Sequence, residues 1–182
     1  VSSFFVFMTI AEFISYIAKE KRYSQHTITA YKKDLQLFST FLIDEFEIET
    51  IESANQEMIR SWVVSMIDEG LSGKSVNRKI STLKSYYNYL IRTSTITENP
   101  ARHIVSVSTP QTLPVYFKED QLNTYLDSEV DVGDFARLRN FLVIELLYLT
   151  GIRRSELINL TISSIDFSNS SIKVLGKRNK QR

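Results

Sequence analysis

The chain has 182 residues, of which 43% are hydrophobic and 12% aromatic, enough apolar side chains for one ordinary core or two small ones. It contains no cysteine and two histidines, which excludes disulfides and thiolate metal sites, argues against zinc, and predicts a cytoplasmic protein without a metal or other cofactor. The formal net charge of +1 does not by itself indicate a nucleic-acid partner.

Residues 1–8 form an apolar start that is too short to span a bilayer and has no basic residue before it, so we expect neither a membrane span nor a signal peptide. The amphipathic pattern begins at Thr9, directly after Met8. We therefore interpret residues 1–8 as a non-native or disordered extension. Thr9 and Glu12 have the spacing of a capping box, which predicts a first helix to about Glu20.

Three more amphipathic helices are predicted before residue 96. Their boundary signals are Ser24 before a helix over about 25–46, Ser53 or Asn55 before a helix that ends at Gly70, and Gly73 before a helix of about 20 residues. The last helix is expected to turn an apolar stripe inward, formed by Val76, Ile80, Leu83, Tyr87, Leu90 and Ile91. Residues 9–96 therefore form a four-helix domain.

Charge is unevenly distributed in this domain. Residues 43–69 contain eight acidic side chains and one basic, whereas residues 71–102 contain six basic and one acidic. A local basic face is the usual footprint of a nucleic-acid partner. Polar groups able to reach phosphates or base edges lie on the expected outward face of the fourth helix (Lys74, Ser75, Asn77, Arg78, Ser81, Thr82 and Ser85) and the polar side of the second (Lys32 and Lys33). An ordinary solvated helix face has the same composition, so composition alone leaves both interpretations open.

All three prolines lie within residues 97–116, which predicts an interdomain linker. A helix through Leu122, Tyr125 and Leu126 is expected next. After a turn near Gly133, a helix is predicted over about 135–149, and its apolar run over residues 141–149 indicates a helix packed on most sides.

The apolar run is followed by Thr150-Gly151-Ile152-Arg153-Arg154-Ser155-Glu156-Leu157. Glycine is the usual helix-ending residue, and the helical pattern restarts at Ser155, so Arg153 is expected to be held by backbone on both sides, as an anion-binding group should be. Residues 168–170 then predict a turn, residues 171–175 a strand, and residues 176–179 the tip of a hairpin.

This block, with Ser163-Ser164-Ile165-Asp166-Phe167 and the Gly176-Lys177-Arg178 segment in the same order, resembles the start of the catalytic domain of a tyrosine recombinase of the Xer or phage-integrase type. The spacing, with Lys177 24 positions after Arg153, makes the resemblance specific. It implies a mainly α fold. An N-terminal four-helix SAM-like core-binding domain and a linker would precede the truncated helical start of the mixed α/β catalytic domain, with the beginning of its small sheet, over residues 117–182.

The resemblance also implies a reaction and a partner. Members of this family cut and rejoin duplex DNA at a partly palindromic site through a 3′-phosphotyrosine, without metal or nucleotide, as a tetramer on two duplexes. Arg153 would clamp the scissile phosphate, Lys177 would protonate the leaving 5′-oxygen, and Glu156 would either support them or act as a plain capping carboxylate. The helices that carry Lys32, Lys33, Lys74, Ser75, Asn77, Arg78 and Thr82 would face the DNA.

The family's later catalytic residues, a His-x-x-Arg block and the nucleophilic tyrosine, are not found in these 182 residues. His26 and His103 precede Arg153, and no tyrosine follows Tyr148. We therefore expect the chain to bind duplex DNA without cutting it. Two other interpretations stay open: a stand-alone DNA-binding module or decayed integrase, and an unrelated helical scaffold whose basic face is only solvated.

Overall fold

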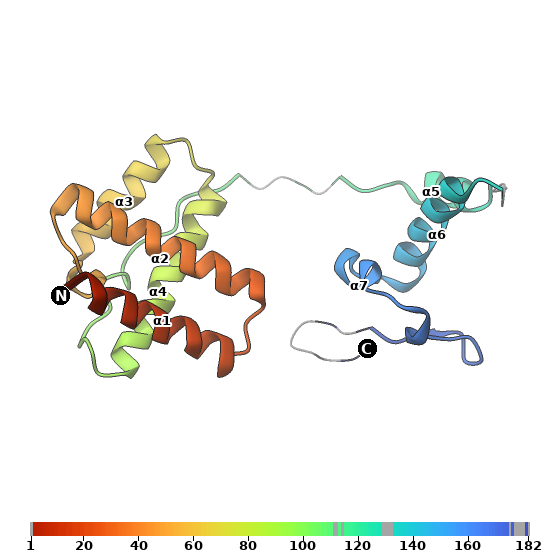
Figure 1. Ribbon diagram of the computed structural model, residues 1–182. Coiled ribbons are helices and arrows are strands. Elements are labelled where there is room, and N and C mark those ends of the chain that lie inside the picture. The colour runs from red at the N-terminus through yellow and green to blue at the C-terminus, as the bar shows by residue number, and fades with distance from the viewer. Residues whose placement is uncertain are drawn as a thin grey trace. The chain divides into compact units, whose positions relative to one another are not determined.

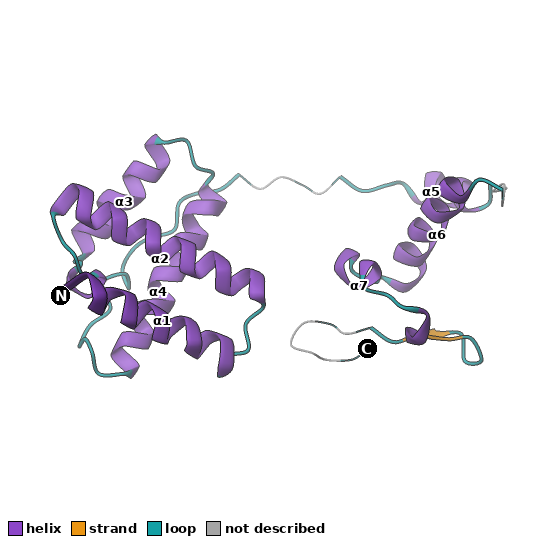
Figure 2. Ribbon diagram, in the orientation of Figure 1, coloured by secondary structure: helices purple, strands orange, loops and turns teal. Residues whose placement is uncertain are grey.

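The computed structural model describes residues 2–110, 113, 115–128, 133–174, 176 and 181 (Figures 1 and 2). It divides into two compact units, Val1–Gln111 and Thr112–Arg182. Both are mainly helical, as the sequence predicts. Within the part of the chain described, no helix is long and apolar enough to cross a membrane.

The first unit is built from four helices and a short 3-10 turn: α1 (Ser2–Lys19), α2 (Gln25–Phe46), η1 (Ile51–Ser53), α3 (Gln56–Asp68) and α4 (Gly73–Arg92). The start signals predicted for α2 and α3 are confirmed, because Ser24 Oγ accepts the Thr27 amide at 3.3 Å and Asn55 Oδ1 accepts the Met58 amide at 3.0 Å. α2 contacts all three other helices, so residues on α2 decide how the unit is assembled.

The predicted start of the first helix is wrong. α1 begins at Ser2, and residues 2–8, expected to be an extension, continue the helix. Thr9 lies inside α1, where its hydroxyl donates to Glu52 Oε1 at 2.7 Å and lies 3.1 Å from the Tyr86 hydroxyl. The Thr9 hydroxyl therefore ties α1 to η1 and α4 instead of capping a helix.

The core of this unit is rich in aromatic rings. Phe38 of α2 and Trp62 of α3 have ring centroids 4.8 Å apart, and Phe13 of α1 meets Tyr86 of α4 edge-on at 5.3 Å. All four side chains are buried. Each contributes about 1.5–3 kcal/mol by leaving water. Since every helix supplies at least one ring, the core holds the four helices together as one unit.

The inward stripe predicted for α4 is correct except at one end. Ile91 was expected to be buried but is 38% exposed, whereas Tyr86, which the prediction omitted, is fully buried. Successive helical residues turn by about 100°. Tyr86 comes three residues after Leu83 and stays on the stripe, while Ile91 follows Leu90 directly and turns off it.

We expect the free energy of unfolding to fall as pH rises above about 10. Burial raises the pKa of the Tyr86 hydroxyl, and burial likewise raises the pKa of Tyr87. The folded state keeps both phenols neutral while the unfolded chain ionises them, so their contribution is fully present below the unfolded pKa and is lost above it, by about 1.4 kcal/mol per pH unit for each. Denaturant unfolding at a series of pH values measures this slope.

A chain with Tyr86→Phe and Tyr87→Phe should lose less stability above pH 10 than the parent. Tyr116→Phe at an exposed site is the matched control. Equal slopes of stability against pH in all three chains would refute the assignment.

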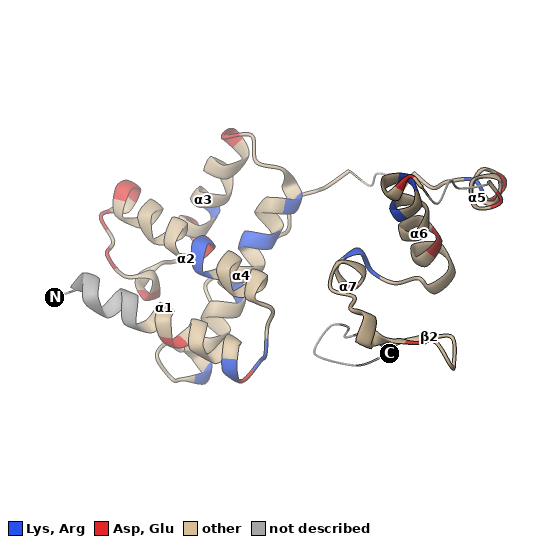
Figure 3. Ribbon diagram, turned by 45° about the vertical axis from the view of Figure 1, so that its right-hand side comes forward, with Lys and Arg blue, Asp and Glu red and all other residues tan. Residues whose placement is uncertain are grey.

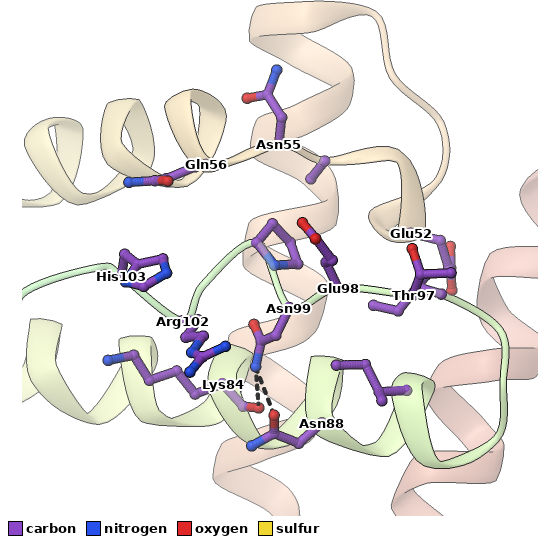
Figure 4. Close-up of a pocket in the computed structure, with 14 residues that line it drawn as sticks. Glu52, Asn55, Gln56, Lys84, Asn88, Thr97, Glu98, Asn99, Arg102 and His103 are labelled. Carbon is purple, nitrogen blue, oxygen red and sulfur yellow. Dashed lines mark hydrogen bonds between the residues drawn. The ribbon is translucent and has the colours of Figure 1, made fainter.

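A segment expected to be linker packs on the first unit. Residues 99–109, named here the strap, run along α4 from its C-terminal half to its start. Asn99 Nδ2 donates to Asn88 Oδ1 at 2.8 Å and to the Lys84 carbonyl at 3.3 Å (Figure 4), and Lys84 Nζ donates to the Ile104 carbonyl at 2.8 Å. Ala101 and Ile104 are buried in the core cluster. The chain therefore leaves this unit after the strap and not at residue 97.

The strap ends against the first turns of α4. The Asn77 side chain donates to the Val107 carbonyl at 2.8 Å and accepts the Val107 amide at 2.7 Å. Close approach also depends on Gly73, where an added Cβ would lie 2.9 Å from Thr109 Cγ2. Asn77 and Gly73 thus fix the point at which the chain departs from α4.

The second unit contains α5 (Glu119–Leu126), α6 (Phe135–Thr150), α7 (Arg154–Ile158), η2 (Ile162–Ser164), β1 (Ile165–Asp166) and β2 (Ser171–Ile172). β1 and β2 are antiparallel, with Ile165 opposite Ile172. The strand predicted over residues 171–175 is shorter than expected, and Leu175 lies outside the described residues.

The predicted burial of α6 is wrong. No side chain of α6, a helix that the structure describes in full, is buried, and Phe135 and Leu149 are 75% and 69% exposed. The elements of the second unit that the structure describes are short, so they cover only part of its apolar surface. An apolar groove of about 640 Å³ lies between α5 and α6 and is lined by Leu122, Tyr125 and Leu147 among others.

Candidate nucleic-acid interface

The side chains predicted to bind DNA are organised around a residue that the sequence analysis did not select. Asp34 of α2 is completely buried. Its Oδ1 accepts Arg78 Nη2 at 2.9 Å and Lys79 Nζ at 3.0 Å, while its Oδ2 accepts Arg78 Nη1 and, at 3.0 Å, the Thr82 hydroxyl. One carboxylate of α2 therefore binds three side chains within one turn of α4, those of Arg78, Lys79 and Thr82.

Two of the predicted contact residues have other partners. Thr82 is fully buried and faces Asp34, so its expected place on the outward face of α4 is wrong. The reason is geometric, because Thr82 immediately precedes the core residue Leu83 and lies at the edge of α4 that meets α2. Asn77 is half-buried and uses its amide on the strap.

The remaining predicted cations are accessible. Lys32, Lys33 and Lys74 are exposed, and the Arg78 side chain is 45% exposed although it binds Asp34. Ser75 is half-buried, with its hydroxyl 3.0 Å from that of the helix cap Ser72. Figure 3 shows Lys and Arg on α4 and on the adjoining part of α2, with Asp and Glu at the far ends of α2 and α3. The first unit thus has separate basic and acidic regions.

Helical geometry distinguishes the two lysines of α2. Asp34 points toward α4, and each residue along a helix turns by about 100°. Lys33 is one position away from Asp34, whereas Lys32 is two positions away and so lies about 200° around the helix. Lys33 is therefore closer than Lys32 to the face of α2 that meets α4.

The predicted phosphate clamp, Arg153, lies in the second unit at a helix junction. α6 ends at Gly151, whose φ of +59° is the left-handed conformation that favours glycine, and Arg153 is the residue before α7. The Arg153 side chain is 60% exposed, so the guanidinium is accessible to a ligand.

Glu156 orients this arginine. Its side chain is 5% exposed and accepts the Arg153 amide at 2.9 Å and Arg153 Nη1 at 2.7 Å. Both ends of Arg153 are therefore held by one carboxylate. Lys177, predicted to act with Arg153, lies outside the described residues, as does the rest of the expected hairpin tip over residues 177–179.

A separate polar pocket of about 800 Å³ lies where the strap begins, beside the C-terminal half of α4 (Figure 4). It is lined by Glu52, Lys84, Asn88, Glu98, Arg102 and His103 among others. None of the predicted DNA-binding residues is among its lining residues, and it mixes acidic with basic side chains. It is therefore distinct from the basic region.

Family models match most of the chain. The model of the phage integrase N-terminal SAM-like domain matches residues 10–94, and the model of the phage integrase family matches residues 116–182. The first match coincides with the four-helix unit, and the second includes Arg153, Glu156 and Lys177.

Curated relatives are similar over nearly the whole chain. Tyrosine recombinase XerC of Pediococcus pentosaceus is 33% identical over 173 residues, which cover 95% of this chain and 58% of the relative. The XerC of Anoxybacillus flavithermus is 36% identical over 174 residues, which cover 96% of this chain and 57% of the relative. The chain spans a little over half the length of these relatives.

Solved structures share the fold. A lambda integrase dimer bound to a COC′ core site aligns with a TM-score of 0.68 and 17% identity over 97% of this chain and 60% of that chain. The Tn1549 transposon integrase in complex with transposon right end DNA aligns with a TM-score of 0.67 and 21% identity over 95% and 55%. A lambda integrase tetramer bound to a Holliday junction gives 0.68 and 18% over 96% and 47%. These matches confirm the predicted fold class, a SAM-like helical domain followed by part of an integrase catalytic domain.

Proposed function

The chain belongs to the phage integrase family of tyrosine recombinases, and we propose that it serves site-specific DNA recombination, in which duplex DNA is cut and rejoined through a 3′-phosphotyrosine. The observation that carries the proposal is the similarity to XerC recombinases over 95% of the chain, across both structural units. The DNA complexes of the lambda and Tn1549 integrases, which share the fold, support duplex DNA as the partner.

In this proposal the first unit holds the DNA. Lys33, Lys74 and Arg78 contact phosphates or base edges from the side on which α2 meets α4, and Lys32 and Ser75 lie at the margins of this contact. Lysine and arginine supply the sequence-independent part of DNA binding by displacing counterions from phosphates. Asn77 and Thr82 are not among the proposed contacts, because their side chains bind the strap and Asp34.

The second unit contributes to the chemistry. Cleavage of a phosphodiester passes through a transition state with extra negative charge on the non-bridging oxygens, and preorganised cations stabilise it. Arg153 supplies a planar guanidinium that can bind two such oxygens, and Glu156 holds it in place. Lys177 is proposed as the general acid that protonates the leaving 5′-oxygen.

The proposed partners follow from the same family. We propose a partly palindromic site and a tetramer on two duplexes for the recombination reaction, in line with the lambda integrase tetramer bound to a Holliday junction. A second candidate function is binding of the site without catalysis. The observation that favours it is that the exposed cations Lys33, Lys74 and Arg78 all lie in the first unit, whereas Arg153 lies in the second.

Residues 1–182 are expected to bind duplex DNA and to form no covalent adduct with it. The reason is that the DNA-facing cations are present while no tyrosine follows the Arg153 block. Fluorescence anisotropy with a labelled duplex measures binding, and gel electrophoresis after incubation with a nicked suicide duplex measures covalent attachment. No binding at low salt, where phosphate contacts are strongest, would reject the DNA partner; an adduct would show that one of the nine tyrosines acts as a nucleophile.

A further inference from the structure

The buried carboxylate of Asp34 leaves part of Arg78 available. A guanidinium carries five N–H donors. Asp34 takes one from each terminal nitrogen of Arg78, so three donors remain, and the side chain is 45% exposed. Arg78 is therefore fixed at its inner edge and accessible at its outer edge.

The support for Asp34 is itself rigid. Lys79 and Thr82, one and four residues after Arg78 on α4, donate to the same carboxylate, and both are buried, at 7% and 0% exposure. Lys79 Nζ also lies 5.9 Å from the centroid of the Trp62 ring, which links the cluster to α3. The carboxylate cannot rotate without breaking hydrogen bonds to three side chains of α4.

We propose that Asp34 is a positioning residue for DNA binding: it fixes the Arg78 guanidinium so that its outer N–H groups face a phosphate or base edge before DNA arrives. This inference rests on the proposed function of the first unit. A long arginine side chain ordinarily loses rotamer freedom on binding, at a cost of about 0.5–1.5 kcal/mol, or about 2- to 10-fold in affinity. Because Asp34 already restricts the Arg78 side chain before DNA binds, this loss of rotamer freedom does not occur on binding.

Three possible roles of Asp34 predict different changes in DNA affinity when its charge is removed. As a negative charge close to DNA, Asp34 would oppose binding, so its neutralisation would raise affinity. As a purely structural residue, it would leave the affinity of the folded protein unchanged when neutralised. As a positioning residue, it gives the opposite of the charge effect, and neutralisation lowers affinity.

The test is a double-mutant cycle on residues 1–182, with anisotropy of a fluorescein-labelled duplex as the readout. Asp34→Asn keeps the shape of the side chain and is expected to weaken binding by about 2- to 10-fold in the parent. In an Arg78→Met background it is expected to leave affinity unchanged or to raise it, because no guanidinium is left to position. Circular dichroism and Trp62 fluorescence establish that each variant is folded before its affinity is compared.

The outcomes are decisive in both directions. Unchanged or stronger binding by Asp34→Asn in the parent, or an equal loss in both backgrounds, would overturn the proposal. Lys74→Met is the control for the proposed function, since it removes a DNA-facing cation that Asp34 does not touch. If Lys74→Met and Arg78→Met weaken binding while Asp34→Asn does not, the DNA face stands and the positioning role fails.

A second measurement does not depend on a folded variant or on DNA binding. In nuclear magnetic resonance spectra of the parent without DNA, the Arg78 guanidinium is expected to show slow rotation and a resolved set of N–H signals. Arg60, an exposed arginine of α3, is the control and is expected to give averaged signals. Free rotation of the Arg78 guanidinium would overturn the proposal even if Asp34→Asn failed to fold or the chain bound no DNA.

Discussion

Replacing Lys33, Lys74 and Arg78 together by methionine is expected to lower the affinity of residues 1–182 for duplex DNA by about 500-fold at about 0.1 M salt. Each phosphate contact contributes about 0.9 to the slope of log K against log salt, which is about 8-fold in affinity at that salt concentration. Three contacts multiply to the stated loss. The slope itself should fall by about 2.7, and titration by fluorescence anisotropy at several salt concentrations measures both quantities.

The matched control removes the same charge elsewhere. Lys19, Arg60 and Arg102 are exposed cations of α1, α3 and the strap, and their joint replacement by methionine changes the net charge equally. We expect this control to change the slope by much less than 2.7, because these side chains make no proposed phosphate contact. Equal losses in both triple variants would mean that net charge, and not the α2–α4 face, governs binding.

Single substitutions on α2 refine the same test. Lys33→Met is expected to weaken binding more than Lys32→Met, because Lys32 lies about 200° around the helix from Asp34, which points at α4. A larger effect at Lys32 would place the DNA on the other side of α2.

The helices of the first unit were predictable because their signals are local. Ser24, Asn55 and Gly73 lie at the boundaries that the structure shows, and the spacing of apolar residues correctly gave most of the α4 stripe. The capping box at Thr9 was misleading for a physical reason. A Thr-x-x-Glu pattern can serve a tertiary contact equally well, and Thr9 bonds Glu52, which is 43 residues away.

The contacts that organise the candidate site were not predictable in the same way. Asp34 follows two lysines and resembles any solvated acid in the sequence; its burial depends on which face of α2 meets α4. In the sequence, Asn77 likewise resembles an amide that contacts DNA. In the structure its side chain is hydrogen-bonded to Val107 of the strap. These assignments depend on packing between segments 30 or more residues apart, which a local pattern does not contain.

In the second unit, the sequence predicted more burial than the structure shows. The run from Phe141 to Leu149 is apolar enough to suggest a buried helix, yet every side chain of α6 retains some exposure. Apolar composition shows which residues of a helix can be buried. Burial also requires a packing partner, and the composition of the helix does not show whether one is present. The Arg153 block was more informative, because glycine at the end of α6 and Glu156 within α7 are local features that fix the arginine's position.

Replacing Asp34 by alanine is expected to lower the free energy of unfolding of the first unit by about 3–5 kcal/mol. The substitution leaves the buried Lys79 ammonium without its counter-charge and removes the hydrogen bonds of the Asp34 carboxylate to Arg78, Lys79 and Thr82 of α4. Urea unfolding followed by tryptophan fluorescence measures the effect, since Trp62 is the single tryptophan and Lys79 lies against its ring. A loss below about 1 kcal/mol, the size of an exposed ion pair, would contradict the burial of this cluster.

Joint replacement of Asp34 by leucine and Lys79 by methionine is expected to recover most of that loss, because an apolar pair of similar volume avoids the cost of taking two charges out of water. Thr82 keeps a partner in the Arg78 carbonyl at 3.2 Å, so the change strands no buried hydroxyl. If the pair variant is as unstable as Asp34→Ala, the charges themselves stabilise the fold. If it is stable but binds DNA more weakly than the parent, the buried charges are not needed for folding. Their place in the interior is then explained by the arginine that they hold toward the DNA.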